Sequence, residues 1–101
     1  MLKYRIINCE NSIKSVEVTG HANFADYGKD IVCAAVTTAI TMTVNQLEIF
    51  NQLINIEYEM SEGKFELNVI NNNEVIQNIL KNLENALIDL NDQFPKNIKN
   101  L

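Results

Sequence analysis

Alternation of apolar and polar residues over positions 53–60 is the feature that most restricts how this chain can fold. One side of the alternation carries Ile54, Ile56, Tyr58 and Met60, and the other carries Asn55, Glu57 and Glu59. The next three residues, Ser61-Glu62-Gly63, are typical of a tight turn, and Gly63 suits a positive φ. Beyond the turn, the inward face of a second strand carries Phe65, Leu67 and Val69. The pattern predicts a β-hairpin with one apolar face that another layer must cover.

A second pair of strands is predicted near the N-terminus. Residues 2–8 and 15–19 each alternate between apolar and polar side chains, and the polar residues 8–12 between them indicate a hairpin connection. Gly20 ends the second of these strands. Ile13 is out of phase with the alternation, which indicates either a β-bulge or an outward apolar contact.

Each predicted strand pair is followed by a helical pattern. Residues 30–52 are rich in β-branched side chains, which favour strands, but the run is too long for one strand and contains no Gly or Pro. The side chains at helical spacing in this run are Val32, Val36, Ala39, Thr43, Leu47 and Phe50. Asp30 is the expected N-cap, because its carboxylate can accept hydrogen bonds from the free N–H groups two and three positions on.

The second helix is expected to begin at residues 71–73, where Asn71 and Glu74 have the spacing of a capping box. Its apolar stripe consists of Ile76, Ile79, Leu80, Leu83, Leu87 and Leu90. Phe94-Pro95 is expected to stop the helix, because proline cannot continue it. The remaining residues are expected to form a tail that frays.

The predicted order, β-β-α-β-β-α, fits a single α+β domain over residues 1–101. The chain of 101 residues is long enough for one modest core. Half-exposed strands need a cover on one face only, so we expect two layers, with a four-stranded sheet and both helices packed on one face.

Charge and composition restrict which partners and which cellular compartment are expected for this chain. With a net charge of −5, the chain is not expected to have the basic surface that binds the phosphates of nucleic acid. Its negative charge is compatible with a basic protein partner. The N-terminus has no pattern of a signal peptide. The most apolar run, residues 31–44, is interrupted by threonines and is shorter than the roughly 20 residues that a membrane span needs. We therefore expect a cytoplasmic protein without membrane contact, in which Cys9 is a spare surface thiol and Cys33 is also free.

His21 and Cys33 are the residues best suited to chemistry. With Asp30 as the cap, Cys33 would lie in the first helical turn, where unpaired N–H groups and the helix dipole favour negative charge on its sulfur. The same N–H groups, or those of the preceding loop, could hold an oxyanion. The loop at 22–29 is expected to fold the His21 imidazole back over the helix start, which would pair a nucleophile with a general base.

The same residues also have structural interpretations. Cys33 could be a small buried apolar residue, and His21 could simply fix a loop. The chain would then be a non-enzymatic α/β adaptor that binds a protein partner. A metal site has less support, because one His and one nearby Cys would need Asp26 or Asp30 to complete the ligand set.

Four residues in and beside the loop are candidates for a hinge or for substrate contact: Gly20, Phe24, Tyr27 and Gly28. Gly28 lies just before the predicted helix and can adopt backbone angles that other residues avoid. The rings of Phe24 and Tyr27 either anchor the loop to the sheet or belong to a lid that an apolar substrate segment would order.

The segment GHANFADYGKDIVCAAVTTA resembles the signature of the ribosomal-processing cysteine protease family, Prp. The family pattern is Gly-His-Ala, a short loop, a further Gly and then Asp-Ile-Val-Cys-Ala-Ala-Val, and it is matched from Gly20 to Val36. The small size and element order of the family also match, so the resemblance covers essentially the whole chain. One departure is Thr37, where the family usually has Ser; the hydroxyl is kept and a methyl group is added.

The resemblance implies a cysteine endopeptidase with a Cys–His dyad, in which Cys33 is the nucleophile and His21 the base and acid. Asp30 matches a motif position, and either orients His21 or only caps the helix. The implied substrate is the precursor of a bacterial large-subunit ribosomal protein, number twenty-seven, which loses a short N-terminal extension by cleavage after an aromatic residue. A homodimer is also implied, and the chemistry needs no metal or cofactor.

Overall fold

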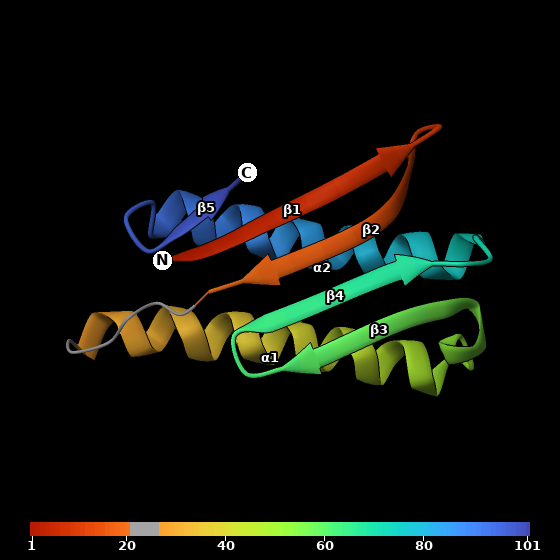
Figure 1. The fold of residues 1–101 in the computed structure, drawn as a ribbon, viewed down its shortest axis with the longest axis horizontal. Helices are drawn as coiled ribbons and strands as arrows, with labels where there is room; N and C mark the ends of the chain where they lie inside the picture. The colour runs from red at the N-terminus through yellow and green to blue at the C-terminus, as the bar shows by residue number, and fades with distance from the viewer. Residues whose placement is uncertain (21–26) are drawn as a thin grey trace.

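A computed structural model describes residues 1–20 and 27–101, with only the backbone described for residues 27–30. The elements are β1 (Leu2–Cys9), β2 (Ser12–Thr19), α1 (Tyr27–Ile49), a 3-10 turn η1 (Leu53–Asn55), β3 (Ile56–Ser61), β4 (Lys64–Val69), α2 (Glu74–Gln93) and β5 (Ile98–Asn100). Figure 1 shows the strands side by side in one sheet, with α1 and α2 both on the same face. The predicted two-layer α+β arrangement is therefore confirmed.

The sheet has five strands in the order β3-β4-β2-β1-β5, rather than the predicted four. β5 pairs parallel to β1 and is formed by the residues that were expected to fray. Ile98 explains the difference, because its side chain is fully buried in the core. Backbone hydrogen bonds to β1 hold the segment at both ends: the Leu2 N–H donates to the Asn97 carbonyl at 3.0 Å, and the Leu101 N–H donates to the Tyr4 carbonyl at 2.8 Å.

A β-bulge lies where Ile13 falls out of phase. The register between β1 and β2 shifts between Ile7 and Asn8, and Ile13 is buried. Of the two interpretations from the sequence, the bulge is confirmed and the outward contact is wrong. The Gln77 side chain from α2 satisfies the Ile13 backbone: its Oε1 accepts from the Ile13 N–H at 2.8 Å, and its Nε2 donates to the Ile13 carbonyl at 2.9 Å.

The start of α2 differs from the prediction by two residues. Asn73, rather than Asn71, is the N-cap, and its Oδ1 accepts from the Ile76 N–H at 2.9 Å. The Asn73 Nδ2 also donates to Gln52 Oε1 at 2.7 Å, which fixes the cap to the segment after α1. The predicted end at Phe94 is confirmed, because the helix stops at Gln93.

The long β-branched segment is a helix, as its spacing predicts, but α1 begins at Tyr27 and not after Asp30. Its core-facing side chains include Val32, Val36 and Leu47. The buried Thr43 hydroxyl donates to the Ala39 carbonyl at 2.8 Å, so burial leaves it no unpaired donor. Phe50, placed on the same face from the sequence, lies just beyond α1 and is exposed.

α1 also contains a stretch, Ile31–Ile49, of 19 residues with a mean hydropathy of 1.2, which by length and composition could cross a membrane. The apolar stretch is therefore longer than residues 31–44, and its length does not exclude a membrane span as the sequence prediction did. A core helix of a globular domain has the same composition, and one side of α1 is packed in the core of this domain.

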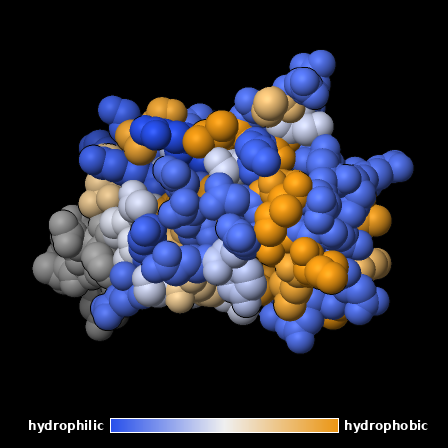
Figure 2. All heavy atoms as spheres, turned by 45° about the vertical axis from the view of Figure 1, so that its right-hand side comes forward, coloured by the Kyte–Doolittle hydropathy of each residue, from blue (hydrophilic) through white to orange (hydrophobic). Residues whose placement is uncertain are grey.

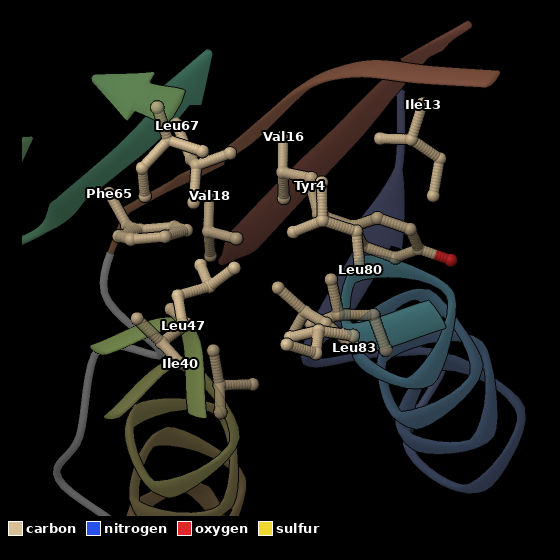
Figure 3. Close-up of a cluster of buried hydrophobic side chains, with 14 of the residues drawn as sticks. Tyr4, Ile13, Val16, Val18, Ile40, Leu47, Phe65, Leu67, Leu80 and Leu83 are labelled. Atoms are coloured by element: carbon tan, nitrogen blue, oxygen red, sulfur yellow. The ribbon is translucent and has the colours of Figure 1, made fainter. Parts of the chain in front are cut away.

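The core lies between the sheet and the two helices. Figure 3 shows sheet side chains pointing toward two separate helix faces. Near α1 the labelled side chains are Val18, Ile40, Leu47, Phe65 and Leu67, and near α2 they are Tyr4, Ile13, Val16, Leu80 and Leu83.

Apolar side chains are also exposed where α1 ends and η1 begins. Ile49, Phe50 and Ile54 are all exposed. Figure 2 shows hydrophobic side chains gathered in one area of an otherwise largely hydrophilic face. Ile54 was predicted to share the inward face of the next strand, but it lies in η1, ahead of the strand, and points away from the core.

Candidate active site

A cleft of about 310 Å³ lies between α1 and the turn that joins β3 to β4. α1 contributes Cys33, Val36, Thr37 and Ile40 to its lining, the hairpin contributes residues 60–65, and Gly20 lies at the end of β2. The lining is mainly apolar, with the polar groups of the β3–β4 turn and Thr37 around it. The cleft can therefore accept an apolar side chain next to a thiol.

Cys33 is the reactive group of this cleft among the described residues. It is half-buried and packs partly against the core, but it also lines the cleft. The interpretation of Cys33 as a fully enclosed core residue is therefore wrong. Its neighbour Val32 is completely buried, so the helix places one residue in the core and the next at the cleft.

The predicted position of Cys33 in the first helical turn is wrong. With α1 beginning at Tyr27, Cys33 is in the second turn. The unpaired N–H groups of a helix belong to its first residues, which here lie about one turn before Cys33. The unpaired N–H groups at the helix start therefore do not lie in the same turn as the Cys33 thiol, as the prediction of a thiolate and oxyanion site there required.

Three more predicted site residues lie within α1. Tyr27 is its first residue and Gly28 its second, so neither belongs to the loop assigned to residues 22–29, and Gly28 is not a hinge ahead of the helix. Asp30 has helical backbone and is not the N-cap. The sequence misplaced this boundary because Gly28 suggested a break, whereas the helix runs through it.

His21, Phe24 and the rest of positions 21–26 lie outside the described residues. The predictions of a Cys–His pair and of a lid at this place are therefore not tested by the fold. Among the residues that are described, no three His, Cys, Asp or Glu side chains gather as a metal site would need.

Gly20 fixes the point at which the chain leaves β2 toward His21. It has a φ of +96°, and a Cβ at this position would collide with the Met1 carbonyl oxygen, so only glycine fits. Its N–H donates to the Gly63 carbonyl in the β3–β4 turn at 2.9 Å. Gly20 is thus held between two backbone segments, the Met1 carbonyl and the β3–β4 turn.

The β3–β4 turn is the part of the cleft that sequence reasoning missed. The hairpin itself was predicted, and Gly63 has the expected positive φ, +77°. β4 pairs with β2, which brings the turn beside Gly20 and across from α1. No local sequence pattern predicts the pairing of β4 with β2, because the two strands are separated in the chain by α1 and β3.

The sequence of this chain matches the family model described as cysteine protease Prp over residues 1–99. A curated relative, the ribosomal processing cysteine protease Prp of Staphylococcus aureus strain Mu50, is 28% identical over 95 residues, which cover 92% of this chain and 90% of the relative. The Bacillus subtilis protein of the same name is 53% identical over 36 residues, or 36% of this chain and 32% of the relative.

Solved structures agree with this assignment. The ribosomal processing protease Prp of S. aureus in complex with a substrate peptide has a TM-score of 0.87 at 26% identity, covering 100% of this chain and 98% of that chain. The S. aureus Prp with a covalently linked product peptide has a TM-score of 0.85 at 27% identity, covering 99% and 97%. SMU.848 of Streptococcus mutans has a TM-score of 0.79 at 26% identity, covering 99% and 91%.

These matches decide between the enzyme and the non-enzymatic adaptor in favour of the enzyme. The match to the family model spans nearly the whole chain, and the half-buried Cys33 opens into a cleft of the same domain. The chain belongs to the cysteine protease Prp family.

Proposed function

We propose that this protease removes the N-terminal extension from the precursor of a bacterial large-subunit ribosomal protein, number twenty-seven, in the cytoplasm. The observation that carries the proposal is the position of Cys33 in a mainly apolar cleft of a Prp-family domain. A cleft of this character suits an apolar residue beside the scissile bond. The acidic chain, with a net charge of −5, also suits a basic ribosomal protein.

In this proposal Cys33 and His21 form the catalytic dyad. His21 takes the thiol proton, and the Cys33 sulfur attacks the scissile carbonyl carbon to give a tetrahedral oxyanion. His21 then gives the proton to the leaving amine as the C–N bond breaks, which leaves a thioester on Cys33. A water molecule, deprotonated by His21, attacks the thioester and releases the acid and the free thiol.

Two further residues have roles in the proposal. Asp30, which matches a position of the family motif and has helical backbone within α1, is assigned the role of orienting His21. Thr37 is exposed one turn after Cys33 on α1 and lines the same cleft, so its hydroxyl is available to substrate.

The proposed enzyme is a homodimer that uses the exposed face of α1. Between Asp30 and Glu48 this helix carries no charged residue. Its exposed residues form a stripe that includes Ile31, Ala34, Thr38, Met42, Asn45 and Ile49. A long uncharged helix face is typical of an interface rather than of a solvated surface.

Processing of the precursor tests the proposal. Purified wild-type chain is incubated with the unprocessed ribosomal protein, beside the variants Cys33→Ala, His21→Ala and Cys9→Ala, and the product mass is measured. We expect the wild type and Cys9→Ala to remove the extension, and the other two to lose processing together, because a dyad acts as one unit. Cleavage by Cys33→Ala at the wild-type rate, with all variants folded by circular dichroism, would refute the proposal.

A further inference from the structure

β3 leaves one long edge of the sheet open. It is the outermost strand next to β4, and within residues 1–20 and 27–101 no strand pairs with its other side. The opposite edge is β5, which has only three residues. Figure 1 shows β3 along the border of the sheet, ending at the turn to β4. An open strand edge offers a row of backbone donors and acceptors to another extended chain.

The register shows which backbone groups of β3 face outward. The Ile70 N–H donates to the Asn55 carbonyl at 2.8 Å, one position beyond the pair Ile56–Val69. Because bonded and non-bonded pairs alternate in an antiparallel ladder, Glu57, Glu59 and Ser61 direct their N–H and C=O groups toward β4. The backbone groups of Ile56, Tyr58 and Met60 therefore point to the open edge.

This edge leads directly to the cleft. Met60 and Ser61, the last two residues of β3, line the cleft together with Cys33 and Thr37. An extended peptide that followed the edge past Met60 would therefore be guided toward the thiol.

The side chains of β3 also differ from those of a fully covered strand. Tyr58 and Met60 lie opposite the buried Leu67 and Phe65, yet they are 44% and 45% exposed. On the other face, Glu59 lies opposite Glu66, and Lys64 is 3.6 Å from Glu66 and 4.0 Å from Glu59. The edge strand thus offers apolar side chains on the face of the sheet that carries the helices, and negatively charged side chains on the opposite face.

From this arrangement we infer that the peptide substrate binds as an additional strand on the open edge of β3, hydrogen-bonded to the backbone of Tyr58 and Met60. Its side chains on the helix side pack against the Tyr58 and Met60 side chains, and basic side chains on the other side lie near Glu57 and Glu59. Main-chain hydrogen bonds supply affinity, while alternate side-chain contacts supply selectivity. The inference rests on the proposed protease function and names how that site holds its substrate.

The first test is a backbone scan of the substrate. The probe is a synthetic peptide spanning the junction of extension and body in the ribosomal precursor, first shown to be cleaved by the wild type. Copies N-methylated at single residues are then bound to the Cys33→Ala variant, so that affinity is measured without turnover. We expect about tenfold weaker binding at every second residue of the segment, where a hydrogen bond to β3 is lost, and little change between them. Uniform tolerance along the segment would overturn the inference.

The second test changes β3 itself. Tyr58→Pro removes an outward N–H but none that bonds β4, so the ladder should survive, as proline is tolerated at sheet edges. Tyr58→Ala is the matched control, because it removes the same ring and keeps the N–H. We expect Tyr58→Pro to bind the peptide about tenfold more weakly than Tyr58→Ala, with unchanged circular dichroism. Equal affinity of the two folded variants would overturn the inference.

The two levels of the proposal fail in different ways. If the wild type cleaves neither the precursor nor the junction peptide, the proposed function is wrong. If it cleaves both, but the N-methyl scan shows no alternation and Tyr58→Pro matches Tyr58→Ala, the protease stands and the β3 edge does not bind its substrate.

Discussion

At the scale of the residue, the cleft depends on a few positions at which the surrounding structure restricts which residue can occupy the site. Gly20 can only be glycine because the Met1 backbone occupies the space of a side chain. Cys33 lies one position after the fully buried Val32, so a shift of the helix by one residue would bury the thiol. The sequence identified both residues, yet it placed Cys33 in the wrong turn because it placed the helix start three residues too late.

Tyr4 gives a prediction about pH. Its ring is almost completely buried, and burial raises the pKa of its hydroxyl, with Asp92 and Glu84 adding to the rise. The folded state therefore holds the phenolic proton more tightly than the unfolded state, so stability is retained at neutral pH and falls as the pH rises past the ordinary tyrosine value. We expect Tyr4→Phe to flatten this alkaline loss of stability in urea unfolding.

A comparison of the slopes of unfolding free energy against pH is the readout for Tyr4. Tyr58→Phe is the control, because Tyr58 is exposed on the edge strand. An alkaline slope that is the same in wild type and Tyr4→Phe would show that Tyr4 does not contribute.

At the scale of the element, the predicted helices and strands differ from the observed ones mainly at their ends. The alternation of the strands, the spacing of both helices and the stop at Phe94 were predicted, because each is a local pattern. The cap of α2 was not, since Asn71, Asn72 and Asn73 are alike in sequence and differ only in their contacts, among them the bonds of Asn73 to the Ile76 N–H and to Gln52. β5 was missed for a similar reason. Ile98 is an isolated apolar residue that follows Pro95 by three positions, and its strand becomes evident only from its pairing with β1.

The cap assignment predicts a difference between two neighbouring asparagines. Asn73→Ala removes the acceptor for the Ile76 N–H and should cost about 1 kcal/mol of unfolding free energy. Asn71→Ala is the matched control and should cost much less, because the exposed Asn71 side chain donates to Asn55 Oδ1 at 3.4 Å and the substitution keeps its backbone bond to the Asn55 carbonyl. Chemical denaturation of both variants measures the difference. Equal losses would contradict the assignment of the cap.

At the scale of the whole molecule, two hairpins are joined so that β4 lies beside β2, and this pairing builds the cleft. The turn after β3 meets Gly20 on one side and faces α1 on the other. Local patterns predicted each hairpin, but the pairing of β4 with β2 joins strands that are far apart in the sequence, which no local pattern encodes. The sequence therefore identified candidate residues of the site, whereas the fold was needed to show that Cys33 and the β3–β4 turn line the same cleft.

The uncharged face of α1 predicts the state of association. Met42→Asp places a charge in the middle of this face and should convert a dimer to a monomer in sedimentation equilibrium. Ile88→Asp, at an exposed position on α2, is the matched control and should leave the mass unchanged. A wild-type chain that is already monomeric at all concentrations would contradict the proposed homodimer.

Covalent trapping of the Cys33 thiol tests whether it is the nucleophile of this protease. A junction peptide that ends at the proposed cleavage point is made as a chloromethyl ketone and incubated with the folded wild type, and the modified residue is located by peptide mass mapping. We expect one adduct, on Cys33, whose formation is slowed by unmodified precursor and abolished in Cys33→Ala. An adduct on Cys9, or continued processing of the precursor after Cys33 is fully modified, would contradict this role of Cys33.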